Sequence, residues 1–210
     1  MKTIAALTQI PGKPGRMRVE FRNGEPVELA MDIIARHRLL VGHAVSAETL
    51  RAAQEEDARK EAETAALKLL NRKNCSEQEL RRTLRANGFG ERLVDDVVDK
   101  CRGWGYLDDR RLAEMVVTDA IERRHLGPAR IREALRKRGL EASTQQPSGG
   151  ESSLVDQALA ALKGKERTYA RLDRETARRR MTAFLQRRGF SFDTIRAALA
   201  RLGEDSGEEG

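Results

Sequence analysis

Three stretches of this sequence align without gaps: ELRRTLRANGF (79–89), RIREALRKRGL (130–140) and RMTAFLQRRGF (180–190). In each of them an apolar residue is followed four positions later by a leucine, and residues four apart lie on one face of a helix. A glycine and a final Phe or Leu close each stretch, which is typical of a helix that ends in a left-handed turn. Successive copies are 51 and 50 residues apart, so the sequence predicts a repeat protein.

Further helical patterns flank each copy on both sides. Upstream helices are predicted at about 58–73, 110–125 and 165–175. Downstream, matching apolar positions predict a third helix in every unit, at Val94, Val98 and Cys101, at Val155, Leu159 and Leu162, and at Ile195, Leu199 and Leu202. Each unit is therefore expected to be a bundle of three short helices. Because one such bundle has too small a core to be stable alone, the units are expected to stack.

The first 45 residues have a different pattern. Apolar and charged residues alternate over 16–22 and again over 27–31, with Asn23-Gly24 between them, and this dipeptide is a strong hairpin signal. We predict a further strand at 3–9 and a short helix at 32–40. Ser46 is then expected to cap a long helix that ends near Leu70.

These patterns predict a mainly α fold, in which three three-helix modules form an elongated, curved tandem array behind a small N-terminal β-hairpin or sheet. Residues 141–153 (EASTQQPSGGESS) are polar and lengthen the second unit, so they are expected to form a flexible insertion. The expected boundaries are 1–45 for the hairpin and short helix, 46–109 for the linking helix and first module, 110–163 for the second module, 164–203 for the third module, and 204–210 for a disordered acidic tail.

The segment RGWGYLDDRRLAEM (102–115) holds the only tryptophan of the chain. We expect Trp104, Tyr106 and Leu107 to fill the seam between two modules, because bulky side chains bury large areas at such junctions. Asp108 and Asp109 precede the next helix, where a carboxylate caps free amide groups. The competing interpretation is a metal or catalytic site, which needs further ligands or a base that the neighbouring sequence does not supply.

With these units laid out, the sequence resembles the RecX family, regulators of the RecA recombinase. The similar segments are RGWGYLDDRRLAE (102–114), GPARIREALRKRGL (127–140) and LLNRKNCSEQELRRTLRANGF (69–89). The sequence departs from the family pattern at Leu112, where an aromatic residue is usual, and at Thr118 and Ala120, where arginine is frequent. The resemblance implies three helical modules behind an N-terminal extension. It also implies binding in the groove of RecA filaments and limitation of filament growth, ATP hydrolysis and strand exchange, hence a role in DNA repair, recombination and the SOS response.

The net charge of +7 is concentrated in two blocks. Residues 65–140 hold 18 basic and 12 acidic side chains, and residues 163–202 hold 12 and 4. A basic excess confined to blocks favours an acidic protein surface or a nucleic acid as partner, although many such side chains only keep a helix solvated. The candidate contact residues are Arg81, Arg85, Arg130, Arg132, Arg136, Lys137, Arg178, Arg179, Arg187 and Arg188. Four of these, Arg81, Arg85, Arg132 and Arg136, are predicted to form a repeated stripe beside the apolar seam.

The sequence leaves two function classes open. The first is a non-enzymatic regulator that binds the RecA filament, with direct contact to single- or double-stranded DNA as part of that activity. The alternative is a sequence-neutral or transcriptional DNA-binding helical module. An enzyme is not expected, because the sequence has no Walker A loop, GxSxG, HExxH or clustered His, Cys and Asp residues.

The remaining sequence features predict absences. Cys75 and Cys101 are 26 positions apart and only three histidines accompany them, so we expect no metal, cofactor or disulfide. No run of about 18 apolar residues is present, and a membrane span is not expected. The start of the chain has no apolar signal-peptide region, so we expect a cytoplasmic protein. We also expect it to be a monomer.

Overall fold

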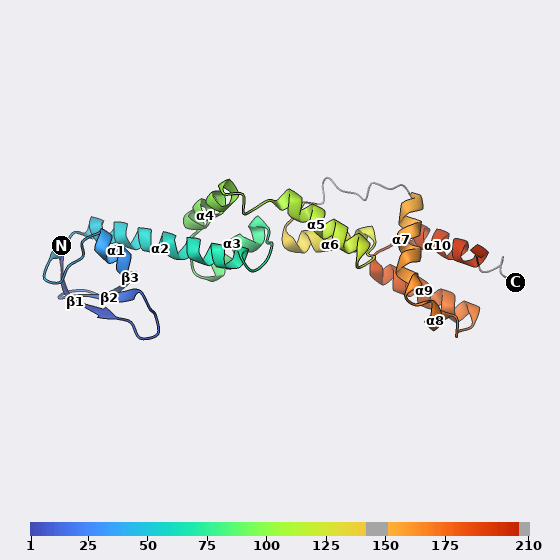
Figure 1. The fold of residues 1–210 in the computed structure, drawn as a ribbon, viewed down its shortest axis with the longest axis horizontal. Helices are drawn as coiled ribbons and strands as arrows, with labels where there is room; N and C mark the ends of the chain where they lie inside the picture. Colours follow the sequence, from blue (N-terminus) through green and yellow to red (C-terminus); the bar gives the residue numbers. More distant parts are fainter. Residues whose placement is uncertain (142–150, 206–210) are drawn as a thin grey trace. The chain divides into compact units, whose positions relative to one another are not determined.

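A computed structural model describes residues 1–141 and 151–205 (Figure 1). The described chain divides into two compact units. The first joins residues 1–73 to 80–104, and the second joins residues 74–79 to the part of the chain that starts at Gly105. Most of the predicted insertion, at 142–150, and the end of the predicted tail, at 206–210, lie outside the described residues.

The first unit begins with a four-stranded antiparallel sheet of order β3-β2-β1-β4. Its strands are β1 (Lys2–Gln9), β2 (Arg16–Phe21), β3 (Val27–Ala30) and β4 (Ala44–Val45). Leu7 pairs with Val19 and Val19 pairs with Val27, so the alternating apolar side chains reach one face. The predicted turn at Asn23-Gly24 lies between β2 and β3. Strand β4 was not predicted, because two residues are too few for an alternating pattern.

Helices complete the first unit. The short helix α1 (Met31–Arg36) ends four residues earlier than predicted, and α2 (Ala47–Leu70) begins as predicted, with the Ser46 hydroxyl accepting a 3.0 Å hydrogen bond from the Thr49 amide. The sheet and α1 share a core with the start of α2. Helix α2 packs against α4 (Glu91–Gly103). The buried leucines of α3 (Glu77–Ala86) are Leu80 and Leu84, as its repeat pattern predicts.

The second unit contains two hydrophobic clusters. One joins α5 (Asp109–Glu122) to α6 (Pro128–Arg138) and holds Leu112, Val117, Ala120, Ile131, Leu135 and Leu140. The other joins α7 (Glu151–Lys163), α9 (Arg174–Arg188) and α10 (Phe192–Asp205), with Leu185, Phe190 and Ile195 at its centre. The short helix α8 (Glu166–Tyr169) contributes the partly buried Tyr169 to the second cluster.

The structure corrects the predicted place of α7. The sequence pattern made it the third helix of the second module, whereas α7 packs on α9 and α10. The apolar spacing predicted the helix but carries no information about which neighbour covers it. Residues 151–153, expected in the flexible insertion, belong to α7, and α10 continues to Asp205 into the predicted tail.

The three glycine turns of the repeat form as predicted. Gly88, Gly139 and Gly189 have φ angles of +89°, +73° and +91°. In each turn the amide of the next residue donates a hydrogen bond to the carbonyl of the buried leucine, at 3.3, 3.0 and 3.2 Å respectively. These bonds satisfy carbonyl groups that the end of a helix leaves without an intrahelical partner.

Candidate partner-binding surface

The basic candidates of the first unit are neutralised by ion pairs. Arg85 binds both carboxylate oxygens of Glu91 at 2.7 Å, and Arg81 pairs with Asp95. The hydrogen bond from Arg85 lowers the pKa of Glu91, so this carboxyl remains ionised and cancels the arginine charge. These two arginines therefore present little free positive charge to a partner.

On α6, two of the four candidates are paired and two are not. Arg130 and Lys137 hold the carboxylate of Glu133 at 2.6 and 2.8 Å, and these hydrogen bonds lower the pKa of Glu133 to about 2. Arg132 and Arg136 are exposed on the same helix. Neither makes an ion pair with any residue that the structure describes. Their charge is therefore available to an acidic ligand.

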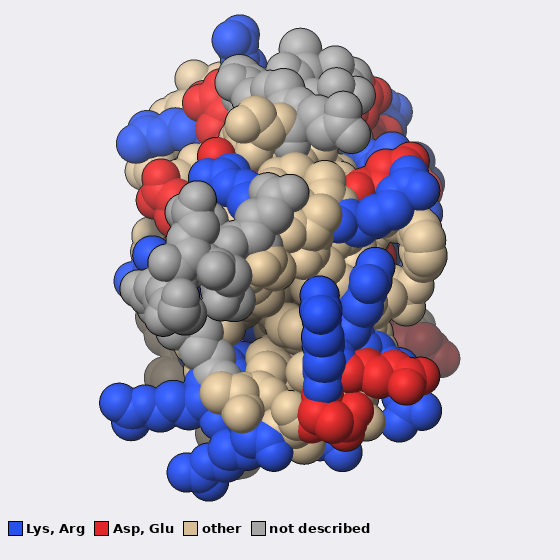
Figure 2. All heavy atoms as spheres, turned by 90° about the vertical axis from the view of Figure 1, so that its right-hand side faces the viewer, with Lys and Arg blue, Asp and Glu red and all other residues tan. Residues whose placement is uncertain are grey.

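Helix α9 carries the largest group of unpaired cations. Arg178, Arg179 and Arg187 are exposed and form no ion pair within 1–141 and 151–205. Arg188 instead lies over the Phe184 ring at 5.0 Å and donates to the Arg124 carbonyl. On the face shown in Figure 2, Lys and Arg side chains at the lower left project without acidic side chains beside them, and other basic side chains lie next to Asp or Glu.

Two further cations of α9 were not among the residues predicted from the sequence. Arg174 and Arg180 are exposed and are likewise unpaired among the described side chains. They belong to the same run, RETARRR (174–180), as Arg178 and Arg179. The density of arginine in that run is the signal that identifies them, and the sequence analysis selected only Arg178 and Arg179 from it.

The predicted arginine stripe thus consists of paired and unpaired members. The next helix of the repeat supplies acidic partners to α3 but has none at the aligned positions beside α9. Glu91 and Asp95 of α4 supply carboxylates to α3, but the aligned positions in the third repeat are Phe192 and Arg196. We call Arg132, Arg136, Arg178, Arg179 and Arg187 the contact surface.

The structure contradicts the predicted burial of two aromatic side chains. Trp104 is 47% exposed and Tyr106 is 56% exposed, whereas Leu107 is 4% exposed and buried as predicted. The Lys100 ammonium lies 4.9 Å from the Trp104 ring centroid, a cation–π contact. Three bulky residues in a loop have no periodicity, so the sequence could not identify the one that faces the core.

Asp108 and Asp109 cap two different helices. Asp108 accepts a 2.8 Å hydrogen bond from the Arg111 amide at the start of α5, as predicted. Asp109 accepts from the Glu77 amide at 3.0 Å and so caps α3, a role that its sequence position did not predict.

No group of three or more potential metal ligands occurs among the described residues. None of the helices described here is both long and apolar enough to cross a membrane.

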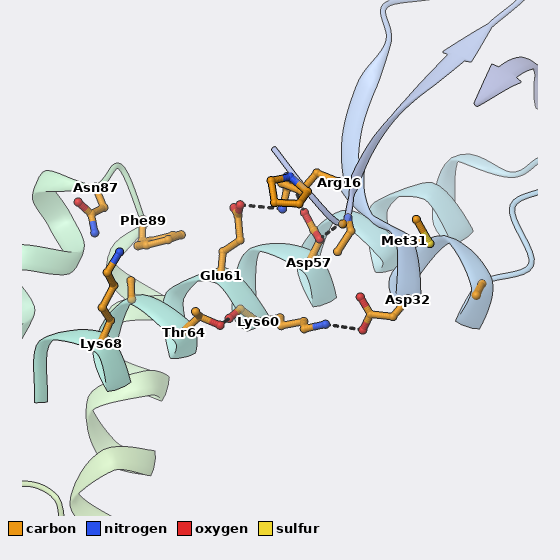
Figure 3. A pocket seen from close by; sticks show the side chains of 15 residues that line it. Arg16, Met31, Asp32, Asp57, Lys60, Glu61, Thr64, Lys68, Asn87 and Phe89 are labelled. Atoms are coloured by element: carbon orange, nitrogen blue, oxygen red, sulfur yellow. Dashed lines mark hydrogen bonds and ion pairs between the residues drawn. The ribbon is translucent and has the colours of Figure 1, made fainter. Parts of the chain in front are cut away.

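A hollow of about 1180 Å³ lies in the first unit between the sheet, α2 and the end of α3 (Figure 3). Its main polar groups bind one another. The Asp57 carboxylate accepts from Arg16 at 2.8 Å and from the Ala30 amide at 2.9 Å, and Arg16 also pairs with Glu61 at 2.7 Å. Groups that are already paired offer little to a ligand, and the hollow is a weaker candidate than the contact surface.

Comparison with known proteins identifies the three helical parts. The profile described as "RecX, first three-helix domain" matches residues 62–101, the second-domain profile matches 108–146, and the third matches 151–199. The third match includes α7, in agreement with the packing of α7 on α9 and α10.

Several curated relatives carry the name "Regulatory protein RecX". That of Halorhodospira halophila is 38% identical over 144 residues, covering 67% of this chain and 88% of that protein. That of Clostridium acetobutylicum is 24% identical over 217 residues, covering 95% and 96%.

Two crystal structures support the same fold. A regulatory protein RecX matches with a TM-score of 0.63 at 19% identity, covering 95% of this chain and 100% of the other. RecX from Lactobacillus salivarius matches with a TM-score of 0.63 at 20% identity, covering 70% and 98%. The chain therefore belongs to the RecX family, whose named members are regulatory proteins.

Proposed function

We propose that this protein is a non-enzymatic regulator that binds the RecA–single-stranded DNA filament and limits its ATPase activity, its growth and strand exchange. The observation that carries the proposal is the contact surface, whose five arginines are exposed and form no ion pair with the described residues. Membership of the RecX family supports RecA as the partner.

The physical argument is one of charge and repetition. Binding of an unpaired arginine to a carboxylate or phosphate costs little free energy, because no internal ion pair has to be broken first. A filament repeats the same surface along its length, so several weak contacts from linked helices reinforce one another. This arrangement suits binding to a polymer rather than catalysis on a small substrate.

A second candidate function is sequence-neutral DNA binding through the same residues. Arginines that are free of internal pairs also suit a phosphate backbone, and such binding weakens steeply with salt. The two functions differ in their requirement for RecA. A DNA-binding module would retard bare single-stranded DNA as effectively as the RecA filament.

The test is the rate of RecA-dependent ATP hydrolysis on single-stranded DNA, measured with and without this protein. We expect the rate to fall as the protein is added at concentrations that leave bare DNA unbound. A rate that stays unchanged while the protein binds bare DNA would favour the second function. An unchanged rate without DNA binding would overturn both.

We further propose that the chain works as an N-terminal extension over 1–45 followed by three three-helix modules, with α7 counted in the third module. We place the protein in the cytoplasm, as a monomer without a cofactor, acting in the regulation of DNA repair and recombination. Gel filtration with light scattering tests the monomer, and a dimer mass would contradict it.

A further inference from the structure

Within the second unit, the first turn of α6 abuts the last turn of α9. The Gly127 amide donates a 2.8 Å hydrogen bond to the Arg188 carbonyl, and the Ala129 amide donates to the Gly189 carbonyl at 3.2 Å. The two helices thus meet end to end through their backbones. We call this contact the α6–α9 joint.

The α6–α9 joint supplies hydrogen-bond partners to backbone groups at the ends of both helices. The first amides and the last carbonyls of a helix lack intrahelical partners, and here one helix supplies the partners of the other. The contact also brings the positive end of α6 to the negative end of α9. Two side chains add to it: the Arg130 guanidinium donates to the Arg187 carbonyl at 2.9 Å, and Arg188 donates to the Arg124 carbonyl.

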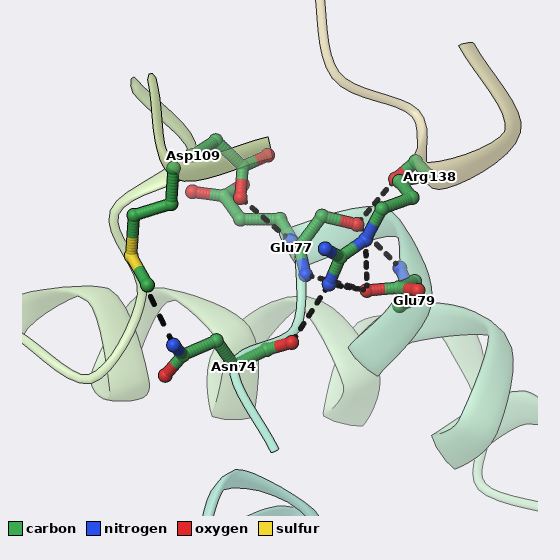
Figure 4. Close-up of polar contacts among 7 residues, drawn as sticks. Asn74, Glu77, Glu79, Asp109 and Arg138 are labelled. Carbon is green, nitrogen blue, oxygen red and sulfur yellow. Dashed lines mark hydrogen bonds and ion pairs between the residues drawn. The ribbon is translucent and has the colours of Figure 1, made fainter. Parts of the chain in front are cut away.

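A related contact joins the first turn of α3, which belongs to the second unit, to the last turn of α6 (Figure 4). The Ser76 hydroxyl donates to the Arg138 carbonyl. The Arg138 guanidinium in turn donates to the Asn74 carbonyl at 2.7 Å and pairs with Glu79 at 3.0 Å. We call this contact the α3–α6 joint.

The two joints use equivalent positions of the repeat. Ser76 aligns with Gly127, and both bond to the carbonyl of an aligned arginine, Arg138 or Arg188. Each of these arginines donates back across its joint to a carbonyl just before the receiving helix. The first repeat has Asn87 at the arginine position. Among the described residues no atom lies within 4 Å of where a Cβ on Gly88 would be, so this end is open.

The joints leave no room for side chains at their glycines. A Cβ on Gly127 would lie 2.5 Å from the backbone of Gly189, and a Cβ on Gly189 would lie 2.6 Å from the Arg130 amide nitrogen. A Cβ on Gly139 would overlap the Gln78 side chain. Real Cβ atoms do not approach backbone this closely, so an alanine at Gly127 must push the joint open.

We propose that the two joints are positioning elements of the contact surface, and that the α3–α6 joint fixes the end of α6 that follows Arg136. The α6–α9 joint holds Arg132 and Arg136 of α6 at a fixed spacing from the arginines of α9, so that both groups reach one partner together. Gly127, Gly189, Arg138 and Arg188 act through this spacing, without touching the partner themselves. The identity of the partner rests on the proposed function, whereas the fixed spacing of the arginines rests on the geometry of the joints.

Gly127→Ala tests the α6–α9 joint, and Gly90→Ala is its matched control. Both glycines precede a helix as N-caps without a side-chain bond, at φ −76° and ψ 168° for Gly127 and φ −70° and ψ 153° for Gly90. No described atom lies within 4 Å of the Cβ position at Gly90. The pair therefore separates loss of the joint from the cost of replacing an N-cap glycine.

Two quantities are measured on the full chain. The first is amide hydrogen exchange at Gly127 and Ala129, which we expect to accelerate in Gly127→Ala and to stay at the wild-type rate in Gly90→Ala. The second is the concentration that halves RecA ATPase activity, which we expect to rise about tenfold in Gly127→Ala only, as linked contacts lose their common geometry.

Arg138→Gln tests the α3–α6 joint and remains informative if Gly127→Ala fails to fold, with the exposed Arg196→Gln as its control. It removes the donor to the Asn74 carbonyl and the ion pair with Glu79, while Glu79 still accepts from the Ser76 amide. The expected result is a smaller loss of inhibition, with faster exchange around residues 74–79. Unchanged exchange in both joint variants overturns the proposal, as does faster exchange with wild-type inhibition. If the wild-type protein does not affect RecA, the proposed function fails, and exchange alone decides whether the joint is closed.

Discussion

Asp57 is a charged side chain that the first unit buries almost completely. Its carboxylate, 6% exposed, accepts from the Arg16 guanidinium at 2.8 Å and from the Ala30 amide at 2.9 Å. It thereby ties α2 to the strand β2 and to the start of α1. Burial of a charge is tolerated here because the carboxylate has partners on both sides.

Asp57→Ala should lower the free energy of unfolding by about 2–3 kcal/mol, since the Ala30 amide loses its acceptor and Arg16 loses its buried partner and keeps only Glu61 and the Glu28 carbonyl. Urea unfolding measures this change. The control is Lys60→Ala, which removes the exposed Lys60–Asp32 pair and should cost under about 1 kcal/mol. Equal costs for the two variants would show that the Asp57 contacts do not stabilise the sheet.

Replacing Leu107 should destabilise the protein more than replacing Trp104, although leucine is the smaller residue. Leu107→Ala should cost about 2–4 kcal/mol because it empties a buried site. Trp104→Ala should cost about 1 kcal/mol, since about half of the side chain is exposed and its contact with Lys100 lies at the surface. Thermal unfolding of both variants decides the order. A larger loss for Trp104→Ala would restore the buried ring that the sequence predicted.

Glu133 should make stability depend on pH in the acid range. Its folded-state pKa of about 2 lies below its ordinary value, so its stabilising effect is present above about pH 4.5 and is lost as the pH falls toward 2. NMR titration of the Glu133 carboxyl measures this pKa directly. Lys137→Met should raise it, because the hydrogen bond from Lys137 is the largest cause of the shift. An unchanged pKa in that variant would mean that Lys137 does not hold the carboxylate.

At the scale of elements, the helices could be predicted because their ends depend on local residues. The contacts between helices could not be predicted. The glycine turns at 88, 139 and 189 and the Ser46 cap follow from the conformations their own residues allow. The packing of α7 on α9 and α10 depends on residues about 30 or more positions away, and periodicity cannot choose between apolar faces. The same holds for Asp109, whose partner Glu77 is 32 residues distant.

Gly88→Ala and Gly139→Ala should separate the cost of the turn from the cost of the joint. Both positions have positive φ, which costs an alanine about 1–2 kcal/mol. At Gly139 the added methyl also overlaps Gln78, which should bring the total to about 2–4 kcal/mol. Chemical denaturation of the two variants measures the difference. Equal losses would show that Gln78 moves away without cost.

At the scale of the whole chain, the sequence predicted the charge but not its accessibility. Arg81 and Arg132 hold the same place in the repeat, yet one is paired with Asp95 and the other is unpaired among the described residues. The ion pairs of Arg81 and Arg85 depend on Asp95 and Glu91 of the neighbouring helix, which the alignment of the middle helices alone does not reveal. For this reason half of the predicted stripe became part of the contact surface and half did not.

Paired and unpaired arginines should differ in their effect on inhibition. Arg178→Glu, Arg179→Glu and Arg187→Glu together should weaken inhibition of RecA ATPase at least about tenfold, because reversed charges repel an acidic partner. The helical circular dichroism should stay unchanged, since exposed substitutions cost about 0.5 kcal/mol or less each. Arg81→Gln with Arg85→Gln removes cations that Asp95 and Glu91 already neutralise, and should change inhibition much less.

Salt offers an independent check of the same surface. Exposed charges are screened over about 8 Å at physiological ionic strength. Added salt should therefore weaken inhibition by the wild-type protein and should affect inhibition by the α9 triple variant far less. Both proteins are compared by the concentration that halves ATP hydrolysis across a salt series. If the triple variant folds and inhibits like the wild type at every salt concentration, the arginines of α9 only solvate their helix. If instead the Arg81 and Arg85 double variant loses inhibition, the partner must break the ion pairs on α4 to reach them, and the contact lies in the first unit.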